Sequence, residues 1–227
     1  MSSAFPLLRL PRLVLFDVFK SLSIGEKIKL SFCSKKVSTQ INNCRLYSQK
    51  VHVHLDMYSH KIEVFENGEN KFKIFNLSDR GTNTDPYKQQ YQIGGNFGLV
   101  EYLTIFSIVN PAFTPVFTSW PQNISIMDSN WFTLKYLLAC TSTTITLKES
   151  RLENKDMDEV LRKWKTGGFP NLQRLEIQSR NITSFGATIF GMNLRELNEL
   201  VIHSDDGSKK ATIKTYHGHI EISVTSF

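Results

Sequence analysis

The sequence predicts an α+β fold in three successive parts: a short N-terminal helical module, a small β-sheet, and a longer α/β region built as a solenoid of repeated units. Three changes of pattern along the 227 residues indicate this order. Apolar residues recur at helical spacing before residue 50, they alternate with polar residues from Val51, and short apolar-x-apolar strands recur beyond Leu99. The hydrophobic fraction of 41% is enough for a packed core and argues against a disordered chain.

The first forty-five residues are typical of short helices in close succession. Pro11 suits the first turn of a helix, because its missing N–H has no partner there in any case. Behind it, apolar residues recur at helical spacing, namely Val14, Leu15, Val18, Phe19 and Leu22. Ser23 and Glu26 have the spacing of a capping box, which predicts the start of a second helix. These two patterns together predict a helical pair between residues 11 and 30.

A third short helix is indicated by Val37, Ile41 and Cys44, which follow one another at steps of four and three. A bundle of three short helices buries only a modest fraction of its surface. The apolar residues it would have to cover are Phe5, Leu7, Leu8, Leu10, Leu13, Leu15, Phe16, Phe19 and Leu22. We therefore expect part of this apolar surface to bind a partner.

These N-terminal residues carry a resemblance to a known family. The Leu10-Pro11 pair, the helical spacing behind it and the Cys33-Ser34-Lys35-Lys36 ending resemble the F-box, particularly its nematode form. The resemblance implies that residues 1–50 dock onto the Skp adaptor of cullin–RING ubiquitin ligases. It implies as adaptor-binding residues Leu7, Leu8, Leu10, Pro11, Leu15, Phe16, Phe19, Leu22 and Ile28. The alternative interpretation is a helical hairpin that only packs on the rest of the chain.

The basic charge of the protein is concentrated in this module. Residues 1–50 carry nine lysines and arginines against two acids, a net charge of +7, whereas the remainder carries 18 against 19. A solvated face or an acidic partner surface accounts for such a cluster. No interleaving of basic and aromatic residues and no nucleic-acid-binding motif accompanies it. The sequence therefore predicts no nucleic-acid partner.

Several patterns favour an intracellular protein, cytoplasmic or nuclear. The sequence holds no run of eighteen apolar residues, so we expect no membrane span and no membrane partner. Arg9, Arg12 and Asp17 interrupt the first apolar runs, where a secretory signal would need an uncharged stretch. The three cysteines lack C-x-x-C spacing, which favours buried free thiols over a disulfide framework.

Period-two alternation begins at Val51 and predicts an antiparallel sheet. The three strands lie at residues 51–55, 61–65 and 72–77, and a polar loop follows them, so residues 51–98 form the expected β segment and linker. Within that loop the Gly94–Gly98 cluster lacks the ending of a phosphate-binding loop and is interpreted as a turn. His52 and His54 share one strand face, yet no third ligand is near in sequence, so no metal site is predicted.

Six short apolar-x-apolar strands recur in the remainder of the chain. They begin at Leu103, Ile124, Ile145, Leu175, Leu200 and Ile220, with spacings of 21, 21, 30, 25 and 20 residues. These spacings resemble leucine-rich repeats, in which each unit is a strand with a helical or irregular return. The long unit has room for a helix over residues 155–167 with Asn154 as its cap. The closing Asn of a leucine-rich turn would fall at Ser129 and Arg180, so the turns depart from that pattern.

Residues 99–227 as a whole, including Phe169-Pro170-Asn171-Leu172 before a strand, resemble the F-box-associated domain that follows the F-box in many nematode proteins. The resemblance implies a domain that selects a protein substrate. The alternative is an ordinary mixed α/β domain whose strands are evenly spaced.

The expected substrate-binding residues follow from strand geometry. If the paired apolar residues of each strand point inward, the residue between them points outward. Those residues are Thr104, Ser125, Thr146, Glu176, Val201 and Glu221. With parallel stacking they would form a ladder that is polar at its start and acidic at its end. This predicts a target that presents hydrogen-bond donors or a basic segment to the C-terminal half of the ladder. The alternative is that they are solvated sheet positions.

No catalytic pattern is present in the sequence. It contains no G-x-S-x-G, no H-E-x-x-H, no C-x-x-C and no paired carboxylates in an apolar setting. We therefore expect no enzyme activity, no cofactor and no metal. The expected function is that of a substrate-recognition adaptor in a Skp–cullin–F-box ligase, which acts by raising the effective concentration of a target near the ubiquitin-charged enzyme. A repeat-based binding protein outside any ligase, and an enzyme with a site of scattered residues, remain alternatives.

Overall fold

The computed structural model describes residues 7–23, 25–27, 30, 35–43, 51–56, 61–66, 70–76, 94–96, 100–107 and 116–227. Its helices are η1 (Leu7–Arg9), α1 (Arg12–Ser21), α3 (Lys35–Asn43), α4 (Leu134–Ala139), α5 (Asn154–Lys165) and α6 (Leu194–Leu197). Its strands are β1 (Val51–Asp56), β2 (Lys61–Glu66), β3 (Asn70–Asn76), β4 (Gly94–Asn96), β5 (Tyr102–Ser107), β6 (Val116–Ser119), β7 (Asn123–Ile126), β8 (Thr144–Ser150), β9 (Arg174–Ser179), β10 (Val201–His203), β11 (Lys209–Tyr216) and β12 (His219–Ser226). Within these ranges no helix is both long and apolar enough to cross a bilayer.

The N-terminal helices form a small core of their own. A helix lies where the sequence predicts one, but α1 begins at Arg12 and Pro11 is its N-cap residue, one place before the first turn. The capping box is also confirmed, because the Ser23 N–H donates to Glu26 Oε2 at 2.9 Å and the Glu26 N–H donates to Ser23 Oγ at 3.4 Å. The core consists of Leu15 and Phe19 from α1 and Val37 and Ile41 from α3. Cys44, which the sequence placed on the third helix, lies outside the described residues.

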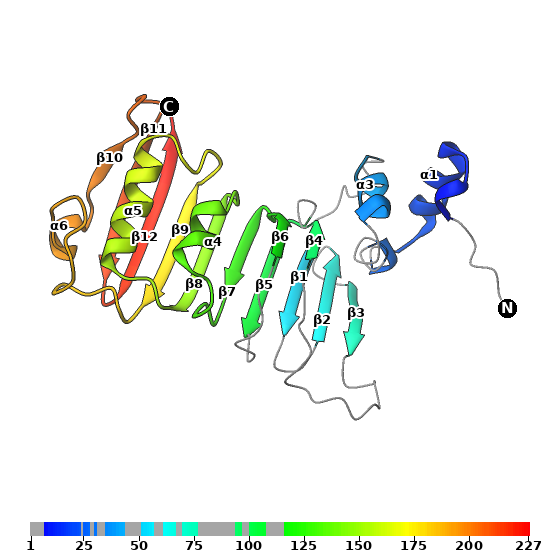
Figure 1. Ribbon diagram of the computed structural model, residues 1–227, viewed down its shortest axis with the longest axis horizontal. Coiled ribbons are helices and arrows are strands. Elements are labelled where there is room, and N and C mark those ends of the chain that lie inside the picture. The colour runs from blue at the N-terminus through cyan, green and yellow to red at the C-terminus, as the bar shows by residue number, and fades with distance from the viewer. Residues whose placement is uncertain are drawn as a thin grey trace.

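One ten-stranded mixed sheet dominates the rest of the molecule (Figure 1), with the order β10-β11-β12-β9-β8-β7-β5-β1-β2-β3. Strands β1, β5, β7, β8 and β9 run parallel to one another. The strands on either side of them, β2 and β3 at one end and β12, β11 and β10 at the other, pair antiparallel. The predicted α+β class is therefore consistent with a few helices on a large mixed sheet.

The main core lies between this sheet and helices α4 and α5, which cover one of its faces (Figure 1). Paired apolar residues of the parallel strands point to this face, in register from Leu103 to Ile124, Ile145 and Leu175. Helix α5 buries its apolar stripe against them, with Trp164 near its end. The spacings of 21, 21 and 30 residues thus correspond to neighbouring parallel strands.

Side-chain hydrogen bonds join the successive turns between these strands. At the carboxyl end of the strands, the buried Ser129 hydroxyl donates to Lys148 O at 2.8 Å and the buried Ser179 hydroxyl donates to Leu152 O at 2.7 Å. At the other end, the Ser142 hydroxyl donates to Pro121 O at 2.7 Å. Lys148 O also accepts the Ser129 N–H at 2.9 Å, so these serines add hydrogen bonds between neighbouring turns.

The structure differs from the expected arrangement in several ways. The strands at residues 51–76 are not a separate small sheet, since β1 pairs parallel with β5. The strand at Ile220 is not a further parallel unit, because β12 runs antiparallel to β9 and forms a hairpin with β11. Beyond β9 the described strands therefore do not form a solenoid of parallel units. Strand periodicity specifies which face a residue takes, and it carries no information on strand direction.

Two local expectations also need correction. Gly94 and Gly95 belong to a short strand, β4, that pairs parallel with β6 and is not a free turn. Asn154 does not cap α5, because Glu153 is the cap residue and forms a capping box with Asp156. The side chain of Asn154 is instead buried and bonded to the chain after β9.

Candidate functional site

The first candidate site is the outer surface of α1. Leu13 is 81% exposed and Val14 is 45% exposed, next to the exposed Pro11 at the start of the helix. Large apolar side chains that face water on an amphipathic helix often mark a surface that binds a partner. These three neighbours therefore make a compact apolar surface, here called the α1 surface, that is suited to docking.

The expected adaptor-binding set is only partly compatible with this surface. Leu15 and Phe19 are buried between α1 and α3, so they hold the module together and do not face a partner. Of the other described members, Pro11 is exposed, and four are half-buried, namely Leu8, Leu10, Phe16 and Leu22. Ile28 and the side chain of Leu7 lie outside the described residues. Val14 was not in the predicted set and neither was Leu13, because helical spacing alone does not tell which of two adjacent apolar residues faces the core.

The second candidate site is the open face of the sheet, which lies opposite α4 and α5. Thr104, Ser125, Thr146 and Glu176 are direct neighbours on adjacent strands, and Glu221 follows next to Glu176. These five residues form the expected ladder, which we call the central row. Val201 is on the same face but outside the central row, because it pairs with Thr212 on β11. Two strands, β11 and β12, separate it from β9.

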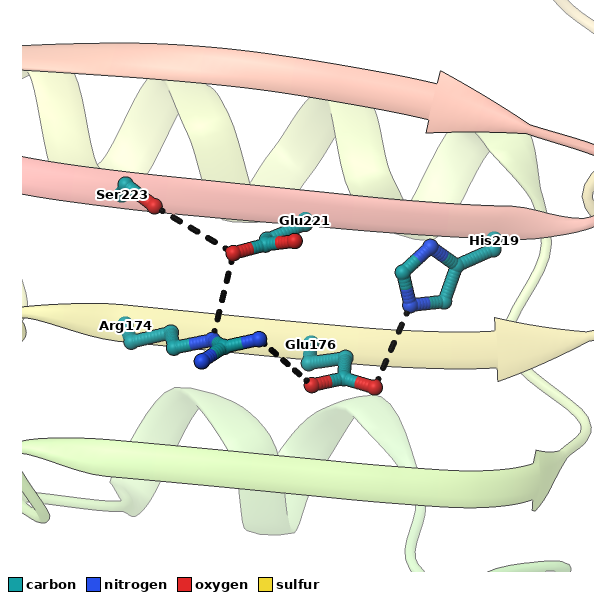
Figure 2. A network of polar contacts seen from close by, with 5 residues as sticks. All are labelled: Arg174, Glu176, His219, Glu221 and Ser223. Carbon is teal, nitrogen blue, oxygen red and sulfur yellow. Dashed lines mark hydrogen bonds and ion pairs between the residues drawn. The ribbon is translucent and has the colours of Figure 1, made fainter.

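A network of charges crosses the end of the central row. Figure 2 shows it on the face of the sheet that points away from the helices. Arg174 contacts both acids, with 3.1 Å from Nη2 to Glu176 Oε2 and 3.2 Å from Nε to Glu221 Oε1. His219 Nε2 lies 3.3 Å from Glu176 Oε1, and the Ser223 hydroxyl donates to Glu221. The two carboxylates therefore already have basic partners, which leaves less free negative charge than the sequence indicates.

Aromatic side chains occupy the opposite end of the same face. Tyr102 and Phe106 of β5 are both exposed. His52 lies against Tyr102 with 4.5 Å between ring centroids, and His54 lies between Phe65 and Phe106 at 4.6 and 5.5 Å. The two histidines thus pack against rings, and in the described part of the chain no three His, Cys, Asp or Glu residues group as metal ligands.

Two titratable groups with shifted pKa values, Cys140 and Asp158, take part in contacts that stabilise the fold. Burial raises the pKa of the Cys140 thiol, which donates to the Ser142 hydroxyl and so has little thiolate character. For Asp158, partial burial opposes ionisation, but the Arg162 side chain and the Phe190 N–H donate to it and lower its pKa. That carboxylate joins α5 to the chain after β9. Neither group has the surroundings of a nucleophile or general base.

Comparison with known families identifies two segments of the chain. Residues 7–49 match the F-box domain, which covers η1, α1 and α3. Residues 117–177 match the F-box associated family, which covers the chain from β6 to most of β9, including α4 and α5. No curated protein and no solved structure matches the chain. The chain therefore has the organisation of an F-box protein, with an F-box domain at its N-terminal end and an F-box-associated domain behind it.

Proposed function

We propose that this protein is an intracellular substrate-recognition subunit of a Skp–cullin–F-box ubiquitin ligase. The observation that carries the proposal is the F-box domain at residues 7–49 with its apolar α1 surface. In this proposal the F-box binds a Skp-family adaptor and, through it, a cullin–RING ligase. The protein supplies no chemistry, since holding a target near a charged enzyme raises its effective concentration.

The proposal assigns target binding to the F-box-associated part, with the open face of the sheet as the recognition surface. This face presents the hydroxyls of Thr104, Ser125 and Thr146 in one row, with aromatic rings at one end and paired charges at the other. Aromatic side chains are enriched at protein-binding surfaces, which also carry hydrogen-bonding groups. The parallel strands β5, β7, β8 and β9 would be leucine-rich-repeat-like units, which the in-register strands and the bonds between their turns support.

Binding of a purified Skp-family adaptor to the full-length chain tests this function. Leu13→Ala with Val14→Ala removes the exposed part of the α1 surface without touching the core of α1 and α3. Desolvated apolar anchors are each worth about 2 kcal/mol, so we expect the affinity to fall at least about thirtyfold. Val201→Ala with Phe185→Ala is the matched control, because it trims two exposed apolar side chains far along the sequence.

Equal adaptor binding by the parent, the α1 variant and the control contradicts the proposed docking surface. A parent chain that captures cellular proteins but binds no Skp-family adaptor supports the alternative, a protein-binding module outside any ligase.

A further inference from the structure

A hollow of about 760 Å³ opens at the carboxyl end of β9. Three segments line it: the chain after β9 with Arg180 and Phe185, helix α6 with Arg195, and the turn between β11 and β12 with Tyr216 and His217. None of its lining residues was expected from the sequence to bind a target. The segments are distant in sequence and meet only because β12 pairs with β9.

The charge of this hollow is positive and uncompensated. Its lining contains two arginines and no aspartate or glutamate. In the described part of the chain, neither Arg180 nor Arg195 has a carboxylate partner, unlike Arg162 and Arg174, whose nitrogens lie 2.6 and 3.1 Å from Asp158 and Glu176. Two guanidinium groups without counter-charges attract anions and can bind carboxylates or phosphates through paired hydrogen bonds.

The other lining residues suit a peptide better than a small ion. Phe185 is 101% exposed and Tyr216 is 71% exposed, so two large rings stand at the rim in water. Arginine and tyrosine are the side chains that most often dominate binding energy at protein interfaces. Asn198 adds a polar contact, because its amide oxygen accepts the Thr215 N–H at 3.0 Å and its amide nitrogen is left as a donor.

Hydrogen bonds and close packing behind the lining residues hold the walls of the hollow in place. The buried Asn154 side chain donates to Thr183 O and Ala187 O at 2.9 and 2.8 Å, and accepts the Thr183 N–H at 3.0 Å. This fixes the segment that presents Phe185. On the other wall, Gly218 sits so close to β9 that a Cβ there would lie 2.7 Å from Ser179 O. A preformed site loses less entropy when a ligand binds.

We propose that this hollow binds an anionic, extended segment of the protein target. Arg180 and Arg195 would contact the anionic groups of that segment, and Phe185 and Tyr216 would contact its apolar side chains. The inference rests on the proposed target-binding role of the F-box-associated part and names the kind of sequence that it selects. The anionic groups are carboxylates or phosphates, which share the geometry that guanidinium binds.

Fluorescence anisotropy with four labelled peptides tests the inference on the full-length chain. All four share a Gly/Ser backbone with one Leu, and carry at the same positions glutamates, phosphoserines, glutamines or lysines. We expect an anionic peptide to bind about tenfold more tightly than the glutamine peptide, with the advantage falling as salt is added. The glutamate and phosphoserine arms distinguish the two sources of charge.

Two double variants locate the binding site. Arg180→Ala with Arg195→Ala should reduce the affinity of the anionic peptide to that of the glutamine peptide. Lys135→Ala with Lys155→Ala, which lie on α4 and α5, removes the same charge and should leave the affinity unchanged. Equal binding of anionic and glutamine peptides, or equal loss in both variants, overturns the inference. That result leaves adaptor binding intact, so it is distinguishable from failure of the proposed function.

Discussion

Asn154 fixes the position of the chain after β9. Its buried amide makes three hydrogen bonds to the backbone of Thr183 and Ala187, and Gly186 lies against it so closely that a Cβ would be 2.7 Å from its amide. Replacing Asn154 by Ala empties a buried position and leaves Ala187 O and the Thr183 N–H without this side-chain partner, while Thr183 O keeps the Gly186 N–H at 3.2 Å. A buried unsatisfied group costs about 1–3 kcal/mol.

We therefore expect Asn154→Ala to lower the free energy of unfolding by about 2–3 kcal/mol, measured by urea titration of tryptophan fluorescence. Asn171→Ala is the control, because this exposed side chain makes one bond of 3.3 Å to Thr141 O. The control should change stability by less than about 0.5 kcal/mol. Equal effects of the two substitutions contradict a special role for Asn154.

Asp206 carries the clearest pH dependence in the described residues. The Ser204 hydroxyl donates to it at 2.6 Å and the Ser208 N–H at 3.0 Å, which lowers its pKa to about 2 from 3.8. A lowered folded-state pKa stabilises the turn above pH 3.8, and this stabilisation is lost as the pH falls toward 2. NMR titration of the Asp206 carboxyl should show the low value in the parent and a value closer to 3.8 in Ser204→Ala. A parent pKa near 3.8 refutes the bonding described.

At the residue scale, the sequence predicted which local features are present better than it predicted where each side chain lies and what it contacts. Asn154 was predicted to cap a helix over residues 155–167, and a helix is there, but Glu153 is its cap and Asn154 is bonded elsewhere. The partner of Asn154 is some thirty residues away in the chain, and local pattern carries no information on such a contact. The same reason explains why Leu15 and Phe19 were assigned to a surface that they do not reach.

Among the elements, the hairpin of β11 and β12 depends on two backbone positions. His217 and Gly218 both have positive φ, as a two-residue hairpin loop requires. Gly218 also passes close to Ser179 O, whereas Gly207 in the turn before β11 has positive φ with open space around it. Comparing substitutions at Gly207 and Gly218 therefore separates the free-energy cost of the backbone conformation from the cost of a steric clash.

Gly207→Ala should lower the stability by about 1 kcal/mol, from the left-handed conformation alone. Gly218→Ala should cost about 2–4 kcal/mol, because strain and clash add and the hairpin must move away from β9. Thermal unfolding followed by circular dichroism measures both. A Gly218→Ala variant as stable as Gly207→Ala shows that the hairpin moves freely.

Elements with strong periodicity were predicted, and short or irregular ones were missed. Helix α1 and the strands at residues 51–76, 103–105, 145–147 and 175–177 lie where alternation or helical spacing placed them. Strands β4 and β6 and helices α4 and α6 have three to six residues, which is too short for a period to be recognised. The strand at Ile220 was predicted, but its antiparallel pairing with β9 was not, since pairing partners are set by tertiary contacts.

On the scale of the whole molecule, the candidate sites are spread along one long axis. Figure 1 shows α1 and α3 at one end of this axis and β10, β11 and β12 at the other, with the parallel strands between them. This arrangement is compatible with the proposed adaptor role, in which the N-terminal helices bind a ligase and a separate surface of the sheet binds a target. The family of the N-terminal module was predictable from forty residues of sequence, whereas the continuity of the sheet from β3 to β10 was not.

The central claim is that adaptor binding and target binding use separate surfaces, and capture from cell extract with two matched variants tests it most directly. Quantitative mass spectrometry would compare proteins bound by the parent, by Leu13→Ala with Val14→Ala, and by Ser125→Arg with Thr146→Arg, after melting curves show that all three are folded. The first variant should lose the Skp-family adaptor and retain the other bound proteins. The second should retain the adaptor and lose bound proteins, because two charged side chains block the central row. Loss of both sets in either variant, or an unchanged set in both, contradicts the account.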